Sequence, residues 1–162
     1  MRYLALVFFA LFLGACASSP EVDQDQLKTL PTGEHQALAS VPKSALGPQD
    51  LAPGECGLFL WSKTDTTKFI FFSKAISGTA LISRATGPEA LTQTNAGGEV
   101  FGQFNTSMAY SGATGVQVAL QMVPGDDLED GQRIQSGLIT MTDIKGWQTK
   151  LPILGVQACK PE

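Results

Sequence analysis

The sequence predicts an all-β domain, a small antiparallel β-barrel or sandwich of about seven strands, behind a disordered tether. The first observation is a series of short runs after residue 53, rich in aromatic and β-branched side chains and bounded by polar turn residues. The second is the content of 17 glycines and 9 prolines in 162 residues, which indicates many turns. The third is that no long stretch repeats apolar residues at helical spacing. We therefore expect a β-domain over residues 54–162.

The first three expected strands span residues 57–62, 68–73 and 78–83. The first two carry apolar side chains at successive positions, so we expect them to lie centrally and to be covered on both faces. The polar residues 63–67 between them are typical of a hairpin loop. Because these strands follow one another with short connections, antiparallel pairing is expected.

The second half of the domain alternates strands with turn-rich connectors. Val116, Val118 and Leu120 share one face at period two, which is the signature of a half-buried strand. Pro152 interrupts the last run and predicts an edge position or a β-bulge, because proline cannot donate to a strand ladder. Further strands are expected at residues 100–104, 116–123, 134–144 and 148–159, a loop or short helix at 84–98, and loops at 106–115 and 124–131.

The opening residues predict export. Arg2 precedes an unbroken apolar run, residues 4–13, that is too short to cross a bilayer of about 30 Å as a helix but has the length of a signal-peptide core. Next comes Leu-Gly-Ala-Cys, residues 13–16, which resembles the lipobox of bacterial lipoproteins. This resemblance implies removal of the signal peptide, residues 1–15, a diacylglyceryl group on the Cys16 thiol, and acylation of the new amino terminus with a chain such as palmitate.

The alternative is an ordinary secretory peptide that is cut near Ala15 or Ala17, with Cys16 incidental. In Gram-negative lipoproteins an Asp after the lipidated cysteine favours retention at the inner membrane, and Ala17 stands at that position here. The resemblance therefore implies the cell envelope, at the periplasmic face of the outer membrane. Acyl chains make a stable membrane anchor, since each buried CH₂ contributes roughly 0.8 kcal/mol.

Residues 16–53 are expected to form the lipidated, disordered tether. They contain five prolines and no aromatic residue, so the segment cannot bury enough surface to offset the entropy of ordering it. The only histidine of the chain, His35, lies here and is interpreted as a solvated linker residue. The side chains expected to dock onto the domain are Leu38, Val41, Leu46 and Leu51.

The cysteine count predicts one disulfide. If Cys16 is lipidated, Cys56 and Cys159 remain as an even pair in an oxidising compartment. A bond between them would tie the first strand to the last and close a loop of about 100 residues, which contributes roughly 4–5 kcal/mol in the chain-entropy model. A zinc site is not expected, because the domain has no Cys-x-x-Cys and no histidine.

Charge and composition exclude several classes of function. The formal net charge is -4 and the 11 lysines and arginines are scattered, so the sequence has no basic stretch that would bind nucleic acid or a membrane surface. A serine or cysteine nucleophile would lack a histidine base within the domain. We therefore expect neither an enzyme nor a bound cofactor.

An acidic run between two expected strands is the sharpest cluster of charges. We interpret it as a solvated hairpin turn with Asp130-Gly131 at the bend. The alternatives are a Ca²⁺ site, which lacks the spacing of an EF-hand loop, and a glycosidase pair, which adjacent carboxylates in one turn rarely form. The four carboxylates are those of Asp126, Asp127, Glu129 and Asp130.

The candidate contact residues are Tyr110, Ser111 and Trp147, which lie near expected turns. Tyr110 and Ser111 belong to the small, polar segment 106–115, and such loops often carry recognition. The domain's other large aromatics are interpreted as core, with the lining of a ligand cavity as the alternative. These aromatics are Phe59, Trp61, Phe69, Phe71 and Phe72.

Two further resemblances concern the domain. The run Ser111-Gly112-Ala113 is similar to the loop by which lipoprotein inhibitors of lysozyme, which are small β-barrels, enter the enzyme's cleft, although here the tyrosine precedes the run. The surroundings of Cys56 and Cys159 are similar to those in small envelope proteins of proteobacteria, a resemblance that implies no activity. We expect a membrane-anchored, non-catalytic module that binds an envelope protein, peptidoglycan or lipid. An enzyme inhibitor is the first alternative, and a lipid carrier or a carboxylate-dependent hydrolase the second.

Overall fold

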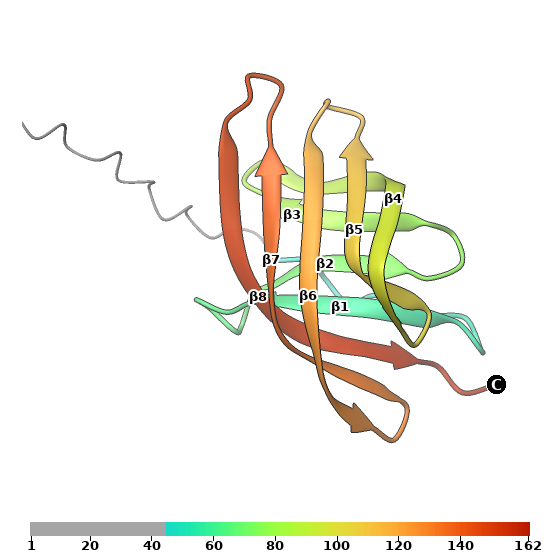
Figure 1. Cartoon of the computed structure of the whole chain (residues 1–162). Coiled ribbons are helices and arrows are strands. Elements are labelled where there is room, and N and C mark those ends of the chain that lie inside the picture. Colours follow the sequence, from blue (N-terminus) through green and yellow to red (C-terminus); the bar gives the residue numbers. More distant parts are fainter. Residues whose placement is uncertain (1–44) are drawn as a thin grey trace, which may run out of the picture. The chain divides into compact units, whose positions relative to one another are not determined.

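A computed structural model describes residues 45–162. The expected signal peptide, Cys16, Leu38, Val41 and His35 lie outside these residues. Antiparallel strands, each paired with the next and the last with the first, close into an eight-stranded barrel (Figure 1). The all-β fold is thereby confirmed, as a barrel and not a sandwich. The strands are β1 (Cys56–Ser62), β2 (Phe69–Lys74), β3 (Thr79–Arg84), β4 (Gly87–Phe101), β5 (Phe104–Gly112), β6 (Gln117–Leu128), β7 (Gly131–Thr142) and β8 (Gln148–Cys159).

Every second side chain of the strands fills the barrel interior. Leu58 and Leu60 of β1, for example, are fully buried, while Phe59 between them points outward. Removing such a side chain from water contributes roughly 1.5–3 kcal/mol, so this core dominates the stability of the fold. The largest fully buried side chains are Tyr110, Phe71, Leu58, Leu60, Ile70, Ile82, Leu120, Ile134, Ile139, Leu151, Ile153 and Val118.

A second apolar cluster lies on the outer face of β1 and β2. The ring centroids of Phe59 and Phe72 are 5.0 Å apart, and those of Trp61 and Phe69 are 5.1 Å apart. Leu46 is only 6% exposed, and its N–H donates a hydrogen bond to the Phe69 carbonyl oxygen at 2.7 Å. The expectations that these strands are apolar on both faces and that Leu46 docks onto the domain are confirmed.

Because Gly57 has no side chain, it makes room for Leu51 in residues 45–53, the segment that covers the outer aromatic cluster. A Cβ placed on Gly57 would lie 2.9 Å from the Phe59 ring, 3.0 Å from the Phe72 ring and 3.1 Å from Leu51 Cδ2. Leu51 therefore occupies the space that a side chain at position 57 would need. Residues 45–53 thus follow the outer aromatic cluster before the chain enters β1.

The predicted loop or helix at residues 84–98 is wrong, because β4 runs through it. Leu91 and Phe101 are the buried residues of this long strand, and the register between β4 and β5 shifts twice. Bulges of this kind interrupt the alternation of apolar and polar positions. Pairing with β3 on one side and β5 on the other holds the segment as a strand despite its weak pattern.

The predicted strand at residues 100–104 and the predicted loop at 106–115 are also wrong. Gly102 and Gln103 form the turn between β4 and β5, and Gly102 adopts a φ of 53° that favours glycine. β5 then continues to Gly112, and pairs antiparallel with both β4 and β6. Each remaining predicted strand overlaps an observed one, but two boundaries are wrong: β7 ends at Thr142, before Ile144, and β6 runs to Leu128, through most of the predicted loop at 124–131.

The seam of the barrel joins β1 to β8. Cys56 and Cys159 are directly opposite each other in the ladder and form the predicted disulfide, 103 residues apart in the sequence. β8 pairs with β1 only from Ile153 onward. Pro152 stands just beyond that ladder, where it pairs with Leu138 of β7, and its carbonyl oxygen accepts a hydrogen bond from the Lys63 N–H at 2.9 Å. It therefore lies at the end of the β1 ladder and not on a free strand edge.

Candidate binding surface

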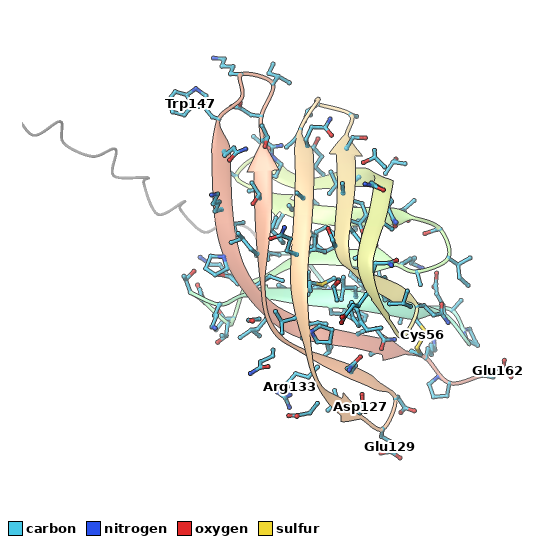
Figure 2. All side chains as sticks on the ribbon, viewed as in Figure 1. Cys56, Asp127, Glu129, Arg133, Trp147 and Glu162 are labelled. Atoms are coloured by element: carbon cyan, nitrogen blue, oxygen red, sulfur yellow. A yellow bond between two sulfur atoms is a disulfide. The ribbon has the colours of Figure 1, made fainter. Side chains whose placement is uncertain are left out.

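The alternating strand directions place the connections at two ends of the barrel. We call the end with the β7–β8 turn the tryptophan end, because it carries Trp147. It also holds the β1–β2 loop, the β3–β4 turn and the β5–β6 turn. The disulfide end holds Cys56–Cys159 and the other three turns. Figure 2 shows Trp147 at one extremity of the barrel, and Asp127 and Glu129 at the opposite extremity.

The β7–β8 turn is a rigid loop that displays apolar side chains. One carboxylate oxygen of Asp143 accepts the N–H groups of Lys145 at 2.8 Å and of Trp147 at 2.9 Å. The Asp143 N–H also donates to the Trp147 carbonyl oxygen, and Gly146 takes a φ of 86°. The side chains of Ile144 and Trp147 nevertheless remain 76% and 73% exposed. Hydrogen bonds therefore fix the backbone of the loop, while two large apolar side chains face water.

The neighbouring β5–β6 turn is held in place by Glu89, a half-buried residue of β4. The N–H and the hydroxyl of Thr114 both donate to one carboxylate oxygen of Glu89 on β4. The other carboxylate oxygen accepts a hydrogen bond from Arg84 Nη1 at 3.0 Å. A Cβ on Gly115 would lie 2.6 Å from Ile144 Cγ2, so this turn packs against the β7–β8 turn. The two turns form one continuous surface.

The β1–β2 loop is held in the same manner. Asp65 accepts hydrogen bonds from the Thr67 hydroxyl at 2.6 Å and N–H at 3.2 Å, and its carboxylate pairs with the Lys68 ammonium at 3.2 Å. The hydrogen bond from Thr67, followed by that from Lys68, lowers the pKa of Asp65 below its ordinary value. The carboxylate thus stays charged at neutral pH and is fully engaged within its own loop.

The two ends differ in charge. At the tryptophan end the carboxylates of Asp65, Glu89 and Asp143 are occupied by the contacts above, while Lys63, Lys145 and Lys150 are exposed. None of these three lysines forms an ion pair within residues 45–162. The sequence shows them scattered, and only the fold brings them to one end.

The disulfide end carries the acidic run. Its four carboxylates lie at the tip of the β6–β7 hairpin, whose turn is Glu129 and Asp130. All four residues are exposed, and the part of the chain described contains no group of three or more side chains that could hold a metal ion. The residues therefore form the exposed tip of a hairpin, as the first interpretation predicted.

The three predicted contact residues lie in different places. The expectation that Tyr110 is exposed is wrong: its side chain is 0% exposed, points into the barrel and packs edge-on against Phe71 with ring centroids 5.4 Å apart. Ser111 is half-buried on the outer face, opposite Thr92. Trp147 is exposed as expected, and its role in binding stays a prediction.

Sequence reasoning missed Ile144 and Glu89. Ile144 was assigned to a strand, although Asp143 and Gly146 on either side are typical of a tight turn closed by an aspartate side chain. Glu89 lay in a segment read as a loop, so nothing indicated that it would reach the turn 25 residues later in the sequence. Only the pairing of β4 with β5 brings the two together.

Two hollows on the described residues 45–162 lie outside the barrel core. One, of about 520 Å³, is open to solvent between the β2–β3 turn and residues 93–96 of β4. The other, of about 430 Å³, lies between the same turn, residues 52–55 and Glu162. The aromatics considered as a cavity lining instead pack in the core or in the outer cluster.

Comparisons of the chain with known protein families, with curated proteins and with solved structures find no match. The case for a function therefore depends on the barrel's own geometry.

Proposed function

We propose that the chain is a lipid-anchored protein of the bacterial cell envelope whose barrel is a non-catalytic binding module. The lipobox-like run that ends in Cys16 supports the anchor, and Ala17 supports the periplasmic face of the outer membrane. The observation that carries the binding role is the tryptophan end, where braced turns hold Ile144 and Trp147 exposed. Exposed aromatics on a rigid support lose little entropy on contact, which suits them to binding.

The anchor is tested by labelling with palmitate. Wild type is expected to incorporate the label, and Cys16→Ser is expected to lose it and to leave the membrane fraction. Cys56→Ser serves as the matched control, because it also removes one cysteine but keeps the label. A wild-type chain without label would overturn the anchor.

The binding surface is tested by crosslinking in the native envelope. A photoreactive amino acid at position 144 is expected to give adducts that mass spectrometry can identify. The control places the same group at Ile76, which is 79% exposed in the β2–β3 turn of the disulfide end. Equal yields from the two positions would contradict a contact surface at the tryptophan end, and turnover of envelope substrates by the purified protein would contradict a non-catalytic module.

A second candidate is an inhibitor of an envelope-degrading enzyme such as lysozyme. It is favoured by the β5–β6 turn, in which Ala113 and Thr114 are exposed while Glu89 holds the loop in place. Inhibition by the purified protein should be lost in Ala113→Arg and kept in Ala119→Arg, which adds the same charge on the outer face of β6. A wild-type protein that leaves lysozyme fully active would exclude this function.

The lipid carrier and the hydrolase gain no such support. A carrier needs an internal cavity, whereas the hollows described above open at the surface. A carboxylate-dependent hydrolase needs two acids in one cleft, whereas the acidic run lies on an exposed hairpin tip.

A further inference from the structure

We infer that the tryptophan end contacts the surface of the anchoring bilayer, with Ile144 and Trp147 among lipid headgroups and Lys145 beside anionic phosphates. This inference rests on the proposed lipid anchor and goes beyond it, because an anchor alone fixes no orientation. The contact surface is formed by the β7–β8 turn, which carries Lys145, and the β5–β6 turn packed against it. Lys150 lies further along β8, and Lys63 lies in the β1–β2 loop of the same end.

The first argument is where the described chain begins. Leu46 is hydrogen-bonded to Phe69, the first residue of β2 and therefore at the tryptophan end. Gly54 is hydrogen-bonded to Lys160, next to the disulfide. Residues 45–53 thus run from the tryptophan end to the disulfide end. The described part of the chain therefore begins at the end that carries the exposed tryptophan.

The second argument is the chemistry of the exposed groups. Tryptophan prefers the interface between water and hydrocarbon, because its ring is apolar and its N–H stays hydrogen-bonded. Lys145 lies in the same turn as Ile144 and Trp147, and basic side chains next to an apolar tip are attracted to anionic headgroups. This combination fits a bilayer surface better than the interior of a protein interface, where lysine is depleted.

The third argument is the charge at the opposite end. The tip of the β6–β7 hairpin carries Asp126, Asp127, Glu129 and Asp130, all exposed. An anionic surface would repel that end and attract the lysines at the other end. Both effects favour the same orientation of the barrel, with the tryptophan end toward the membrane. Figure 2 shows Asp127 and Glu129 far from Trp147, across the length of the barrel.

The contact does not need to be strong. Residues 17–44 separate Cys16 from the described part, and a fully extended chain of that length reaches at most about 100 Å. An anchored domain meets the surface at an effective concentration on the order of millimolar, so weak contacts from one loop are enough to orient it.

The test uses the purified lipidated protein reconstituted in vesicles of phosphatidylcholine, with and without phosphatidylglycerol. Trp61→Phe leaves Trp147 as the only tryptophan. On anionic vesicles we expect its emission to shift to the blue, quenching by aqueous acrylamide to fall, and quenching by brominated lipids to appear. Lys145→Glu should reverse most of these changes, and added salt should weaken them, since it screens the headgroup charge.

The matched control moves the tryptophan to the other end. In the chain with Trp61→Phe, Trp147→Phe and Leu128→Trp, the single tryptophan takes the place of a residue that is 42% exposed at the disulfide end. Its emission and its quenching by acrylamide should not respond to the vesicles. Equal responses from both positions would overturn the orientation.

Flotation of the same vesicles separates the two hypotheses. If the protein does not float with lipid, the proposed anchor fails, and the contact of the tryptophan end fails with it. If the protein floats but acrylamide quenches Trp147 as strongly as it does in detergent, the anchor is supported and the contact of the tryptophan end with the bilayer is overturned. Protection of Trp147 in native envelopes but not in pure lipid would assign this end to a protein partner and would also overturn it.

Discussion

Tyr110 supplies a polar contact inside the barrel. Its hydroxyl lies 3.1 Å from Ser73 Oγ and donates to Met108 Sδ at 3.4 Å. Burial raises the pKa of the Tyr110 hydroxyl above its ordinary value, because the phenolate would lose its hydration, and the hydrogen bond with Ser73 offsets only part of this. The neutral side chain therefore stabilises the fold below about pH 10, and this contribution is lost as the pH rises through the higher folded pKa.

Tyr110→Phe is expected to lower the free energy of unfolding at pH 7 by about 1 kcal/mol, the usual net value of a hydrogen bond. The variant should lose less stability than wild type between pH 9 and 11, because it has no buried hydroxyl to ionise. Urea unfolding at both pH values measures this, with Ser73→Ala as the control that removes the partner and keeps the titrating group. A variant with the same alkaline slope as wild type would show that Tyr110 does not govern it.

Gly155 allows β8 to pack closely against β1. A Cβ at this position would lie 2.1 Å from the Phe59 carbonyl oxygen and 2.8 Å from Leu60 Cδ2. Gly155→Ala should therefore lower the free energy of unfolding by about 3 kcal/mol, at the upper end for overpacked sites.

Gly97→Ala is the matched control for this change, because nothing lies within 4 Å of a Cβ there. Its effect should stay within about 0.5 kcal/mol. Chemical denaturation of the two variants measures the difference. Equal losses in the free energy of unfolding would mean that β1 and β8 can move apart to accommodate the extra methyl group at little cost.

At the scale of elements, the covering segment 45–53 stabilises the barrel from outside. Leu46→Ala should cost about 2 kcal/mol, the lower end for buried leucines, because the site lies at the surface. In a Trp147→Phe background the same change should increase the quenching of Trp61 by acrylamide, since the outer cluster loses its cover.

Leu128→Ala, at an exposed position, serves as the control for Leu46 and should change neither the stability nor the quenching. If Leu46→Ala left the Trp61 signal unchanged, the segment would not shield the cluster in solution.

The elements also show how far the sequence predicts this fold. β1, β2 and β3 were predicted within one or two residues, because runs such as residues 69–72 are unmistakably strand-like. β4 was missed because its outer positions are polar and its bulges break the alternation. β5 was missed even though Phe104, Met108 and Tyr110 occur at even spacing, because the small residues between them are typical of loops.

The candidate surface was harder to predict than the fold. Trp147 was found, because an aromatic residue beside a turn glycine indicates exposure. The contribution of Glu89, Lys63 and Lys145 to this surface could not be predicted. Only the closed barrel brings these residues, which are far apart in the sequence, to one end. Tyr110 was predicted to be a contact residue because the segment around it was predicted to be a loop. In the observed strand β5 alternate side chains point into the barrel, and Tyr110 is one of them.

For the whole molecule, the disulfide is the covalent closure of the barrel. Reduction, or the double change Cys56→Ala and Cys159→Ala, should lower the free energy of unfolding by roughly 4–5 kcal/mol in the chain-entropy model for a loop of about 100 residues. The measurement is urea unfolding with and without a reducing agent. The double variant should not respond to the reductant, and a wild-type loss below about 1 kcal/mol would show that the strand pairing alone closes the seam.

The seam also sets an order of events during biosynthesis. β8 is the last strand to be made, and it supplies the partner of both β1 and β7. A chain whose synthesis stops before β8 keeps two unpaired strand edges, which invite aggregation, and an unpaired thiol at Cys56. The oxidised pair thus reports that the whole barrel has been completed, and the free thiol of an arrested chain is a chemical mark by which a cell could recognise and remove it.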